Sequence, residues 1–513
     1  MSDRGSIPAR QGSGDSRFPA LEAVLLLTMV NFALQPLTEP DFGWHLRTGL
    51  DLLKQGWRLP ALDPYSHTMP DWPWVEHAWF TDLIIGWLDT LFGGLGVILF
   101  FGAVTMAAWI SASSCGRCPW VYRLLACVLS LWVALPFLGA RTQMVTLLGL
   151  GFLTIILDRR LWGSSSVLWL LPPMFLVWAN LHGGFSAGLF LGTLTVCGSA
   201  MVRLVHRRWP TIVGHWDEPI RSWPDLSRLA MILGFAAMLT LLNPYGWRLY
   251  GEIADSLSDR FMLDTLQEWQ PPSLASLAGR SYAIYVAGLG IMTAIWYRRI
   301  EPVRWLVLSV FLILSLRHLR NIPFFLIMSL PLLAEVLHTG FAGIMGLLKL
   351  GPTAVRRGRF VAALAGGLFL VWLGPSHLQH VVLSGLRPAE YFKRTSYPIE
   401  AVLWVRDHRD GLGSRLYNDY EHGGFFLWWL PEEKIFIDGR MPAWRQGDRR
   451  IFQDYVTLNQ LNPSGLSVLD KYSVDWAIVR DQSLLDQALK QAPSWRSVYG
   501  DRKVSIYVRG ERR

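Results

Sequence analysis

Residues 21–49 read LEAVLLLTMVNFALQPLTEPDFGWHLRTG, an apolar run that ends in a polar and acidic stretch. The run from 21 to 37 is about as long as a helix needs to cross a hydrocarbon core of roughly 30 Å. It has no A-x-A-like cleavage site, so we interpret it as an uncleaved first helix. The stretch therefore predicts a membrane span that is followed directly by a loop outside the membrane.

Apolar segments of similar length recur as far as residue 376. The protein has 513 residues, of which 51% are hydrophobic and 17% charged, whereas soluble domains are about 25% charged. Trp79–Phe92 is apolar but short, and predicts an interfacial helix that leads into the second span. We predict about eleven transmembrane helices, at residues 21–37, 95–113, 120–138, 142–157, 166–181, 184–202, 228–243, 281–297, 303–317, 322–337 and 360–376.

The sequence changes character near residue 378, where alternating short strands and helices replace the long apolar runs. The expected strands are 415–418, 434–438, 476–479 and 504–508, and the expected helices are 448–459, 465–472 and 484–490. The fold class is therefore an α-helical polytopic membrane protein with a C-terminal soluble α/β domain. We place the transmembrane domain at residues 1–377, its first outer loop at 38–78, and the extracytoplasmic α/β domain at 378–513.

The distribution of charge predicts the orientation in the membrane. The outer segments 38–78 and 244–280 are rich in acidic residues, whereas the intervening loops are basic. The basic residues of these loops are Arg117, Arg159, Arg160, Arg203, Arg207, Arg208, Arg298, Arg299, Arg304, Lys349, Arg356, Arg357 and Arg359. Positive residues favour the cytoplasmic side, so we expect a cytoplasmic N-terminus and a periplasmic C-terminal domain in a bacterial inner membrane. The same bias explains the net charge of +9, and no nucleic-acid partner is predicted.

This topology brings polar residues that are far apart in the sequence to one membrane surface. A single polar residue at a membrane boundary most often caps a helix or reaches water, but a whole set predicts an outward-facing polar cavity. The set consists of Glu39, Asp41, His45, Arg47, Arg141, His182, Asn243, Arg317, His318, Arg320 and Asn321.

The first outer loop resembles that of the GT-C superfamily of membrane glycosyltransferases, which includes oligosaccharyltransferase catalytic subunits and protein O-mannosyltransferases. Glu39 and Asp41 match the acidic pair after the first helix, WHLR at 44–47 matches an aromatic-His-x-Arg stretch, and DPY at 63–65 matches the segment that enters an interfacial helix. A second resemblance joins residues 418–440 to the start of the oligosaccharyltransferase C-terminal domain, although the tryptophans of its W-W-D-Y-G signature are absent.

The resemblance implies an enzyme that transfers a sugar from a polyprenyl-phosphate-linked donor to a glycan, lipid or protein acceptor, beside membrane lipids. A carboxylate would take the acceptor's proton or hold a cation, and we predict Asp41 for this role with Glu39 as its neighbour. The predicted ligands of a divalent cation, Mg²⁺ or Mn²⁺, are Asp41, Asp63, Glu76 and His77. The predicted donor phosphate-binding residues are Arg317, His318, Arg320 and Arg141. The rest of the cavity would be lined by His45, Arg47, His182, Asn243 and Asn321.

Two other functional classes remain as alternatives. A polyprenyl-linked glycan polymerase or ligase would rely on arginine and histidine more than on a first-loop carboxylate. A lipid or solute transporter favours broken helices at the bilayer midplane and inverted repeats; Pro172 and Pro173 interrupt one predicted span, but no internal repeat is evident. The triplet DGR at 438–440 favours a turn with a local ion pair over an acceptor contact.

Overall fold

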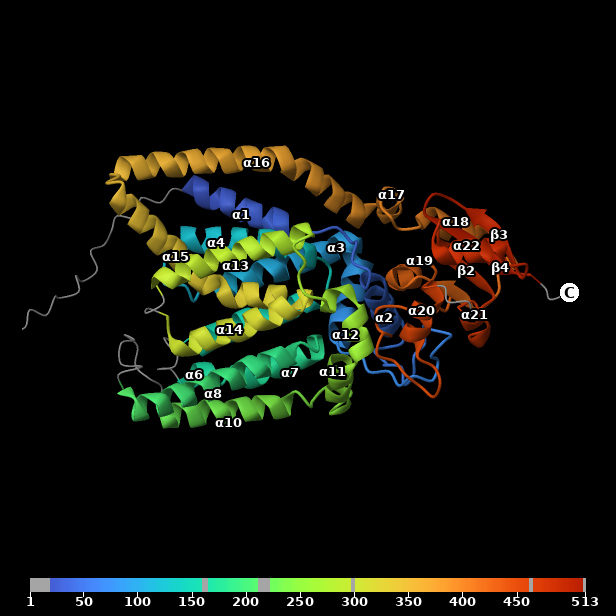
Figure 1. Ribbon diagram of the computed structural model, residues 1–513, viewed down its shortest axis with the longest axis horizontal. Helices are drawn as coiled ribbons and strands as arrows, with labels where there is room; N and C mark the ends of the chain where they lie inside the picture. The colour runs from blue at the N-terminus through green and yellow to red at the C-terminus, as the bar shows by residue number, and fades with distance from the viewer. Residues whose placement is uncertain (1–18, 159–164, 211–221, 297–299, 461–464, 511–513) are drawn as a thin grey trace, which may run out of the picture.

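The computed structural model describes the chain except for residues 1–18, 159–164, 211–221, 297–299, 461–464 and 511–513. It consists of a long bundle of helices with a small α/β domain at one end (Figure 1). We call this end of the bundle the domain-proximal end and the opposite end the distal end. The coarse form of the predicted fold class, apolar helices followed by a small C-terminal α/β domain, is confirmed.

Every predicted span coincides with a helix of the bundle. These helices are α1 (Pro19–Ala33), α3 (Trp79–Ser113), α4 (Trp120–Ala134), α5 (Gln143–Leu157), α7 (Leu171–Leu181), α8 (Phe185–Arg208), α10 (Trp223–Leu239), α13 (Leu277–Trp296), α14 (Pro302–Arg317), α15 (Ile322–Leu347) and α16 (Pro352–Leu386). Among the described residues, five helices are long and apolar enough to cross a membrane. The number of about eleven spans therefore stays a prediction.

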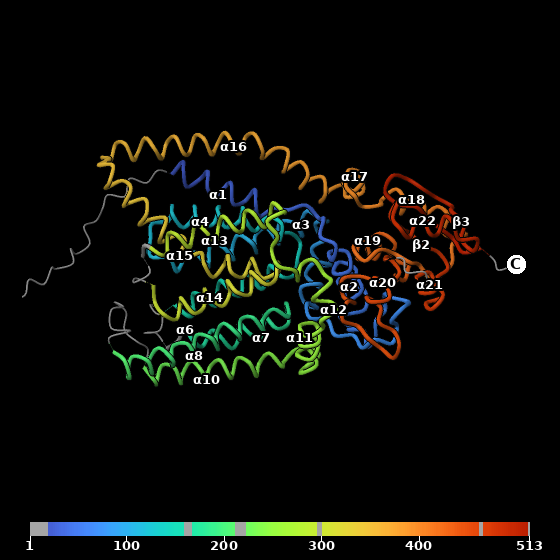
Figure 2. Tube along the Cα trace, viewed as in Figure 1, coloured from blue at the N-terminus to red at the C-terminus, as the bar shows by residue number. Residues whose placement is uncertain are grey.

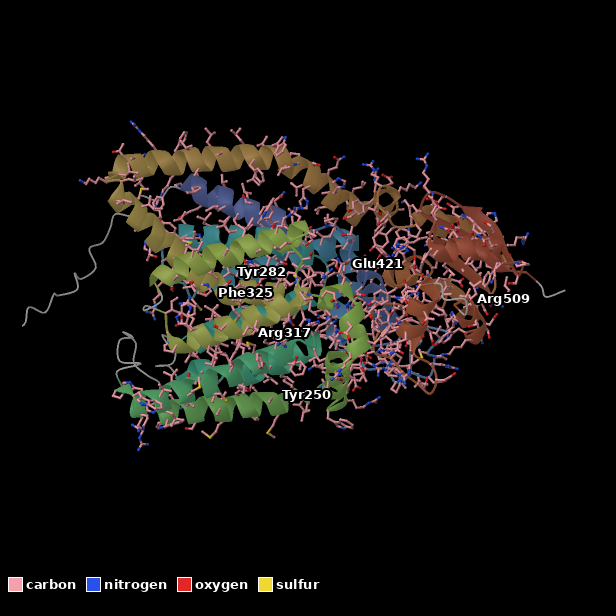
Figure 3. The ribbon with its side chains drawn as sticks, viewed as in Figure 1. Tyr250, Tyr282, Arg317, Phe325, Glu421 and Arg509 are labelled. Carbon is pink, nitrogen blue, oxygen red and sulfur yellow. The ribbon has the colours of Figure 1, made fainter. Side chains whose placement is uncertain are left out.

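Three shorter helices lie at the domain-proximal end, and a fourth lies at the distal end. They are α2 (Phe42–Lys54), α11 (Arg248–Ser258) and α12 (Arg260–Thr265), with α6 (Ser165–Leu168) at the distal end. The long helix α16 runs along the outside of the bundle beside α1 and leads into the C-terminal domain (Figure 2). The bundle interior is apolar and aromatic; for example, the rings of Tyr282 and Phe325 meet edge to face with centroids 6.1 Å apart (Figure 3).

The predicted interfacial helix and the second span form one element, α3, with a break at Gly93. This residue has φ 63°, a left-handed conformation that glycine adopts without strain. The part of α3 before the break packs against α2, where a Cβ on Gly86 would lie 2.5 Å from the carbonyl carbon of Gly49. The break therefore lets α3 support the first outer loop and then continue into the bundle.

The C-terminal domain contains a four-stranded sheet in the order β1-β2-β4-β3. β1 and β2 are parallel, and the other pairs are antiparallel. The strands are β1 (Leu416–Asn418), β2 (Trp476–Arg480), β3 (Trp495–Gly500) and β4 (Val504–Arg509), and the helices are α17 (Pro388–Lys393), α18 (Ile399–Asp407), α19 (Gly423–Trp429), α20 (Ile451–Asn459), α21 (Ser467–Lys471) and α22 (Leu484–Gln491). Three predicted strands and all three predicted helices are confirmed with shifted ends. β3 was not predicted, because this edge strand exposes half of its residues and lacks an apolar pattern.

The prediction of a sheet strand at 434–438 was wrong. Ile435 instead forms an isolated parallel bridge with Ser66 of the first outer loop. Its N–H donates to the carbonyl of Tyr65 at 3.0 Å, and its carbonyl accepts from the N–H of His67 at 3.1 Å. The apolar residues of this segment are buried where the loop meets the domain. The segment therefore attaches the C-terminal domain to the first outer loop.

The domain docks on α2 through close contact between backbones. A Cβ on Gly43 of α2 would lie 1.9 Å from the carbonyl oxygen of Gly424 in α19, and a Cβ on Gly424 would lie 2.3 Å from the carbonyl oxygen of Pro40. Only a residue without a Cβ permits such an approach. The first outer loop is thus held between the bundle and the domain.

Arg440 forms a second connection between the loop and the domain. Its guanidinium donates to Asp438 at 2.6 Å and to Asp63 at 2.8 Å, and all three side chains are buried. The prediction of a turn with a local ion pair at 438–440 is confirmed, with Asp63 as an additional partner. The guanidinium lies 5.2 to 5.9 Å from the ring centroids of Trp44, Tyr65, Trp74 and Trp444.

We predict that Gly43→Ala destabilises the protein. The added methyl group would overlap the carbonyl of Gly424, and overpacking costs about 1–3 kcal/mol, more than the roughly 1 kcal/mol that alanine gains over glycine in helix propensity. Thermal unfolding in detergent, followed by tryptophan fluorescence, should show a lower Tm. Gly251→Ala in α11 is the matched control, because no atom lies within 4 Å of its added Cβ, and its Tm should not fall. An unchanged Tm for Gly43→Ala would contradict the docking contact.

We predict that Arg440→Met is strongly destabilising, since two carboxylates are left buried without their cation, at a cost of about 3–5 kcal/mol. Burial already raises the pKa of Asp438, and Arg440 opposes this rise. Without Arg440 the pKa rises further, and a raised carboxyl pKa means that stability falls as pH increases. The loss of Tm should therefore be larger at pH 8 than at pH 5. Equal loss at both pH values would show that the rings around Arg440, not its charge, matter.

Candidate functional site

The acidic pair of the first outer loop lies at the domain-proximal end, where the bundle, α2 and the C-terminal domain meet. Glu39 is ion-paired with Arg141, which stands two residues before α5, and both side chains are mostly buried. Asp41 stands at the start of α2 and accepts a hydrogen bond from Trp44 Nε1 at 3.1 Å. The structure therefore brings together Glu39, Asp41 and Arg141, and their role in a reaction stays a prediction.

The carboxylate of Asp41 faces the C-terminal domain. A Cβ on Gly439 would lie 1.9 Å from Asp41 Oδ1, so glycine at this position makes room for the carboxylate. Burial and the nearby charge of Glu39 raise the pKa of Asp41 to about 6. Tyr420 also belongs to this region, because burial and then Asp41 raise the pKa of its phenol. A carboxyl group with a pKa close to neutral is suited to exchange a proton with a substrate.

A group of three histidines, His45, His77 and His182, interacts with Asp41 through His45. The rings of His77 and His182 meet edge to face with centroids 5.3 Å apart. His182 Nδ1 accepts a hydrogen bond from the N–H of Gly184 at 3.0 Å and lies 2.7 Å from the hydroxyl of Thr146. Burial lowers the pKa of His45 and of His77 to about 3. Both imidazoles are therefore neutral at physiological pH.

A buried group of possible cation ligands includes a residue that the sequence analysis missed. One side-chain ligand atom each of His45, Glu76 and Asp82 lies within 4.8 Å of the others, and all three residues are buried. Asp82 was missed because it stands in an apolar stretch; a lone acid in such a stretch was the available signal. Of the predicted cation ligands, Glu76 belongs to this group, whereas Asp63 contacts Arg440.

The predicted phosphate-binding arginines and histidine differ in their surroundings. Arg320 donates to Glu268 at 3.0 Å and lies over the ring of Trp269, and its charge contributes to the lowered pKa of His77. His318 Nδ1 lies 2.5 Å from the carbonyl oxygen of Trp269, so it holds the backbone of this turn. Arg317 is exposed at the end of α14. Among the predicted phosphate-binding residues, Arg141 acts electrostatically on Glu39, and Arg320 acts on His77.

Other predicted cavity residues make local structural contacts. Arg47 donates to Asp51 one helical turn away at 2.9 Å. The side chain of Asn243 closes a turn by donating to the carbonyl of Gly246 at 3.2 Å. Asn321 donates to the last turn of α14. A role for these three in the cavity stays a prediction.

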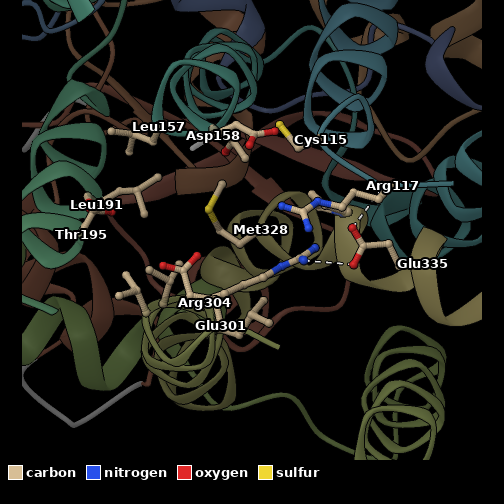
Figure 4. Close-up of a pocket in the computed structure, with 15 residues that line it drawn as sticks. Cys115, Arg117, Leu157, Asp158, Leu191, Thr195, Glu301, Arg304, Met328 and Glu335 are labelled. Atoms are coloured by element: carbon tan, nitrogen blue, oxygen red, sulfur yellow. Dashed lines mark hydrogen bonds and ion pairs between the residues drawn. The ribbon is translucent and has the colours of Figure 1, made fainter. Parts of the chain in front are cut away.

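A separate cavity of about 190 Å³ lies at the distal end of the bundle. In Figure 4, Arg304 donates to Glu335 at 3.1 Å, and the backbone N–H of Arg117 donates to the other carboxylate oxygen at 3.0 Å. Met328 and Leu191 supply part of its apolar lining. Because this cavity lies at the other end of the bundle from Asp41, it is not part of the candidate site.

Comparison with known proteins gives matches in structure but not in sequence. No family model matches the chain, and the search of curated proteins finds no sequence match. The oligosaccharyltransferase of Archaeoglobus fulgidus, in a crystal structure with a tethered acceptor peptide containing the NVT sequon, is 11% identical, with a TM-score of 0.52 over 96% of this chain and 74% of that chain. Its complex with an inhibitory peptide and a dolichol-phosphate gives a TM-score of 0.51 at the same identity.

A weaker likeness, with a TM-score of 0.44 and 14% identity, is to ArnT from Cupriavidus metallidurans bound to undecaprenyl phosphate; it covers 96% of this chain and 98% of that one. At such identities the likeness to the oligosaccharyltransferase concerns the fold. It extends over nearly the whole chain, including the bundle and the C-terminal domain. The chain therefore shares the fold of this oligosaccharyltransferase, in agreement with the fold that the resemblance of the outer loop implies.

Proposed function

We propose that the protein is a membrane glycosyltransferase that transfers a sugar from a polyprenyl-phosphate-linked donor to a glycan, lipid or protein acceptor. The observation that carries this proposal is the position of Asp41. Its carboxylate lies between an apolar bundle and a soluble domain, next to Glu39 and Arg141. A lipid-linked donor keeps its tail in the bilayer and presents its phosphate at the membrane edge, so the chemistry must occur at such a boundary. The oligosaccharyltransferase with the same fold is described in complex with a dolichol-phosphate.

In the proposed reaction, the acceptor's oxygen or nitrogen attacks the anomeric carbon of the donor sugar. Its proton passes to Asp41, the bond between the anomeric carbon and the phosphate oxygen breaks, and polyprenyl phosphate leaves with the electron pair. Attack on the side opposite the leaving group inverts the anomeric configuration. With its pKa raised to about 6, Asp41 is mostly ionised at neutral pH and is a stronger base than an ordinary aspartate.

The charge on the leaving phosphate requires positive groups nearby. Arg141 is paired with Glu39, and Arg320 is paired with Glu268. Each arginine would share its fork of N–H donors between its carboxylate and the phosphate. A divalent cation such as Mg²⁺ or Mn²⁺ would also neutralise phosphate charge.

We also propose that the N-terminus is cytoplasmic and that the C-terminal domain is periplasmic, in a bacterial inner membrane. The basic ends of α8 and α16, which include Arg208 and Arg356, lie at the distal end, and the acidic first outer loop lies at the opposite end. Such an asymmetry is typical of a cytoplasmic distal end. Four arginines behind the prediction, Arg159, Arg160, Arg298 and Arg299, lie outside the described residues.

We predict that Asp41→Asn lowers the rate of sugar transfer by about 10²–10⁴-fold, because the variant cannot accept the proton. The assay uses purified protein in detergent, radiolabelled polyprenyl-phosphate sugars and a membrane-lipid extract as acceptor. Asp255→Asn, which changes an exposed acid of α11 at the same end, is the matched control and should keep full activity. Full activity of Asp41→Asn would instead favour a polymerase or ligase that works through arginine and histidine.

The pH profile provides a separate test. Because Asp41 must be ionised, kcat/KM should rise with pH through about 6 and then level off. Glu39 raises the pKa of Asp41 by its charge, so Glu39→Gln should move this rise to lower pH. A rise that stays in place in Glu39→Gln would mean that another group limits the rate.

A further inference from the structure

The buried group of His45, Glu76 and Asp82 is not used in the proposed proton transfer. The exposed fraction of each residue is at most 4%. The three residues come from different segments: His45 from α2, Glu76 from the end of the first outer loop, and Asp82 from the first turn of α3. Their ligand atoms nevertheless lie within 4.8 Å of one another. The group therefore lies where α2, the end of the first outer loop and the start of α3 converge.

The hydrogen bonds of this group leave one oxygen unused. His45 Nδ1 and Asp82 Oδ1 are 2.6 Å apart, and Glu76 Oε1 accepts from the N–H of Ala78 at 2.9 Å. Asp82 Oδ2 is buried and has no hydrogen-bond partner among the described residues. A buried carboxylate oxygen without a partner is costly, and such atoms usually have a water or an ion as their partner.

The guanidinium of Arg440, whose charge acts on this group, already has other partners. Arg440 acts electrostatically on both Glu76 and Asp82, but its hydrogen bonds go to Asp438 and Asp63. Two carboxylates and an imidazole thus share a buried site with no cationic group bonded to them among the described residues. This is the ligand set that a divalent cation stabilises.

We propose that His45, Glu76 and Asp82 bind one divalent transition-metal ion, Zn²⁺ or Mn²⁺, which fastens the first outer loop to α2 and α3. One nitrogen and two carboxylate ligands suit these ions, whereas Mg²⁺ prefers oxygen ligands and keeps several waters. The free oxygen of Asp82 supplies a ligand atom that needs no existing bond to break. The ion holds the helix whose first residues carry Asp41, so its role toward the reaction is one of positioning.

The test measures metal binding rather than sugar transfer. The full chain is purified in detergent without chelators, and its metal content is determined by mass spectrometry. After treatment with EDTA, the protein is titrated with ZnCl₂, MnCl₂ and MgCl₂ by calorimetry, and its Tm is measured with each. We expect about one equivalent of Zn²⁺ or Mn²⁺ per chain, a Tm that falls with EDTA and recovers with the ion, and much weaker binding of Mg²⁺.

Asp82→Asn and Glu76→Gln should each weaken binding by more than the roughly 10–100-fold that loss of an outer-shell partner costs. His77→Gln is the matched control. His77 Nδ1 lies 3.7 Å from Glu76 Oε1 but His77 is not a member of the group, so this variant should keep its affinity. Loss of binding in His77→Gln together with its retention in Asp82→Asn would overturn the proposal.

The wild-type titration decides the question even if the variants do not fold. Purified protein without metal that also binds neither Zn²⁺ nor Mn²⁺ would show that a shared proton, not an ion, stabilises the two carboxylates. Metal content is read independently of activity. An inactive protein that binds metal would therefore count against the proposed transferase function and not against this site.

Discussion

The contact between α2 and the C-terminal domain is the constraint on which the candidate site depends. Gly43 and Gly424 bring the two backbones together, and α3 supports α2 from the other side through Gly49 and Gly86. Asp41, immediately before α2, is therefore positioned by both contacts. The start of α2 is thus held between α3 and the C-terminal domain, although α2 is not one of the predicted membrane spans.

Burial of charge at this junction is balanced by pairing. Arg141 pairs with Glu39, and Arg440 with Asp63 and Asp438. Buried pairs of this kind add little net stability, but removing one partner is expensive. Of these pairs, the one between Asp63 and Arg440 joins the loop to the domain, so a displaced domain would leave the buried carboxylate of Asp63 without its partner.

The sequence predicted those features that the membrane boundary determines. Glu39, Asp41 and Arg141 were recognisable because each lies next to an apolar run, and a boundary brings such residues together. Contacts between distant segments left no such trace: Asp63 and Arg440 are 377 positions apart. The segment 434–438 illustrates the reason: its apolar residues predict a buried extended segment, but they do not indicate whether it pairs with a sheet or with the first outer loop. Asp82 was not predicted, because the apolar residues around it in the sequence do not indicate that His45 and Glu76 lie close to it in space.

The polar groups near Asp41 have two different structural origins. Arg141 precedes α5, His182 follows α7, and Arg320 lies in the turn between α14 and α15. These residues stand at helix ends, where a bundle in lipid can expose charge. Asp41, in contrast, belongs to a loop whose place is set by the domain. In the proposed reaction, the bundle would then hold the donor's phosphate while the domain sets the position of the base.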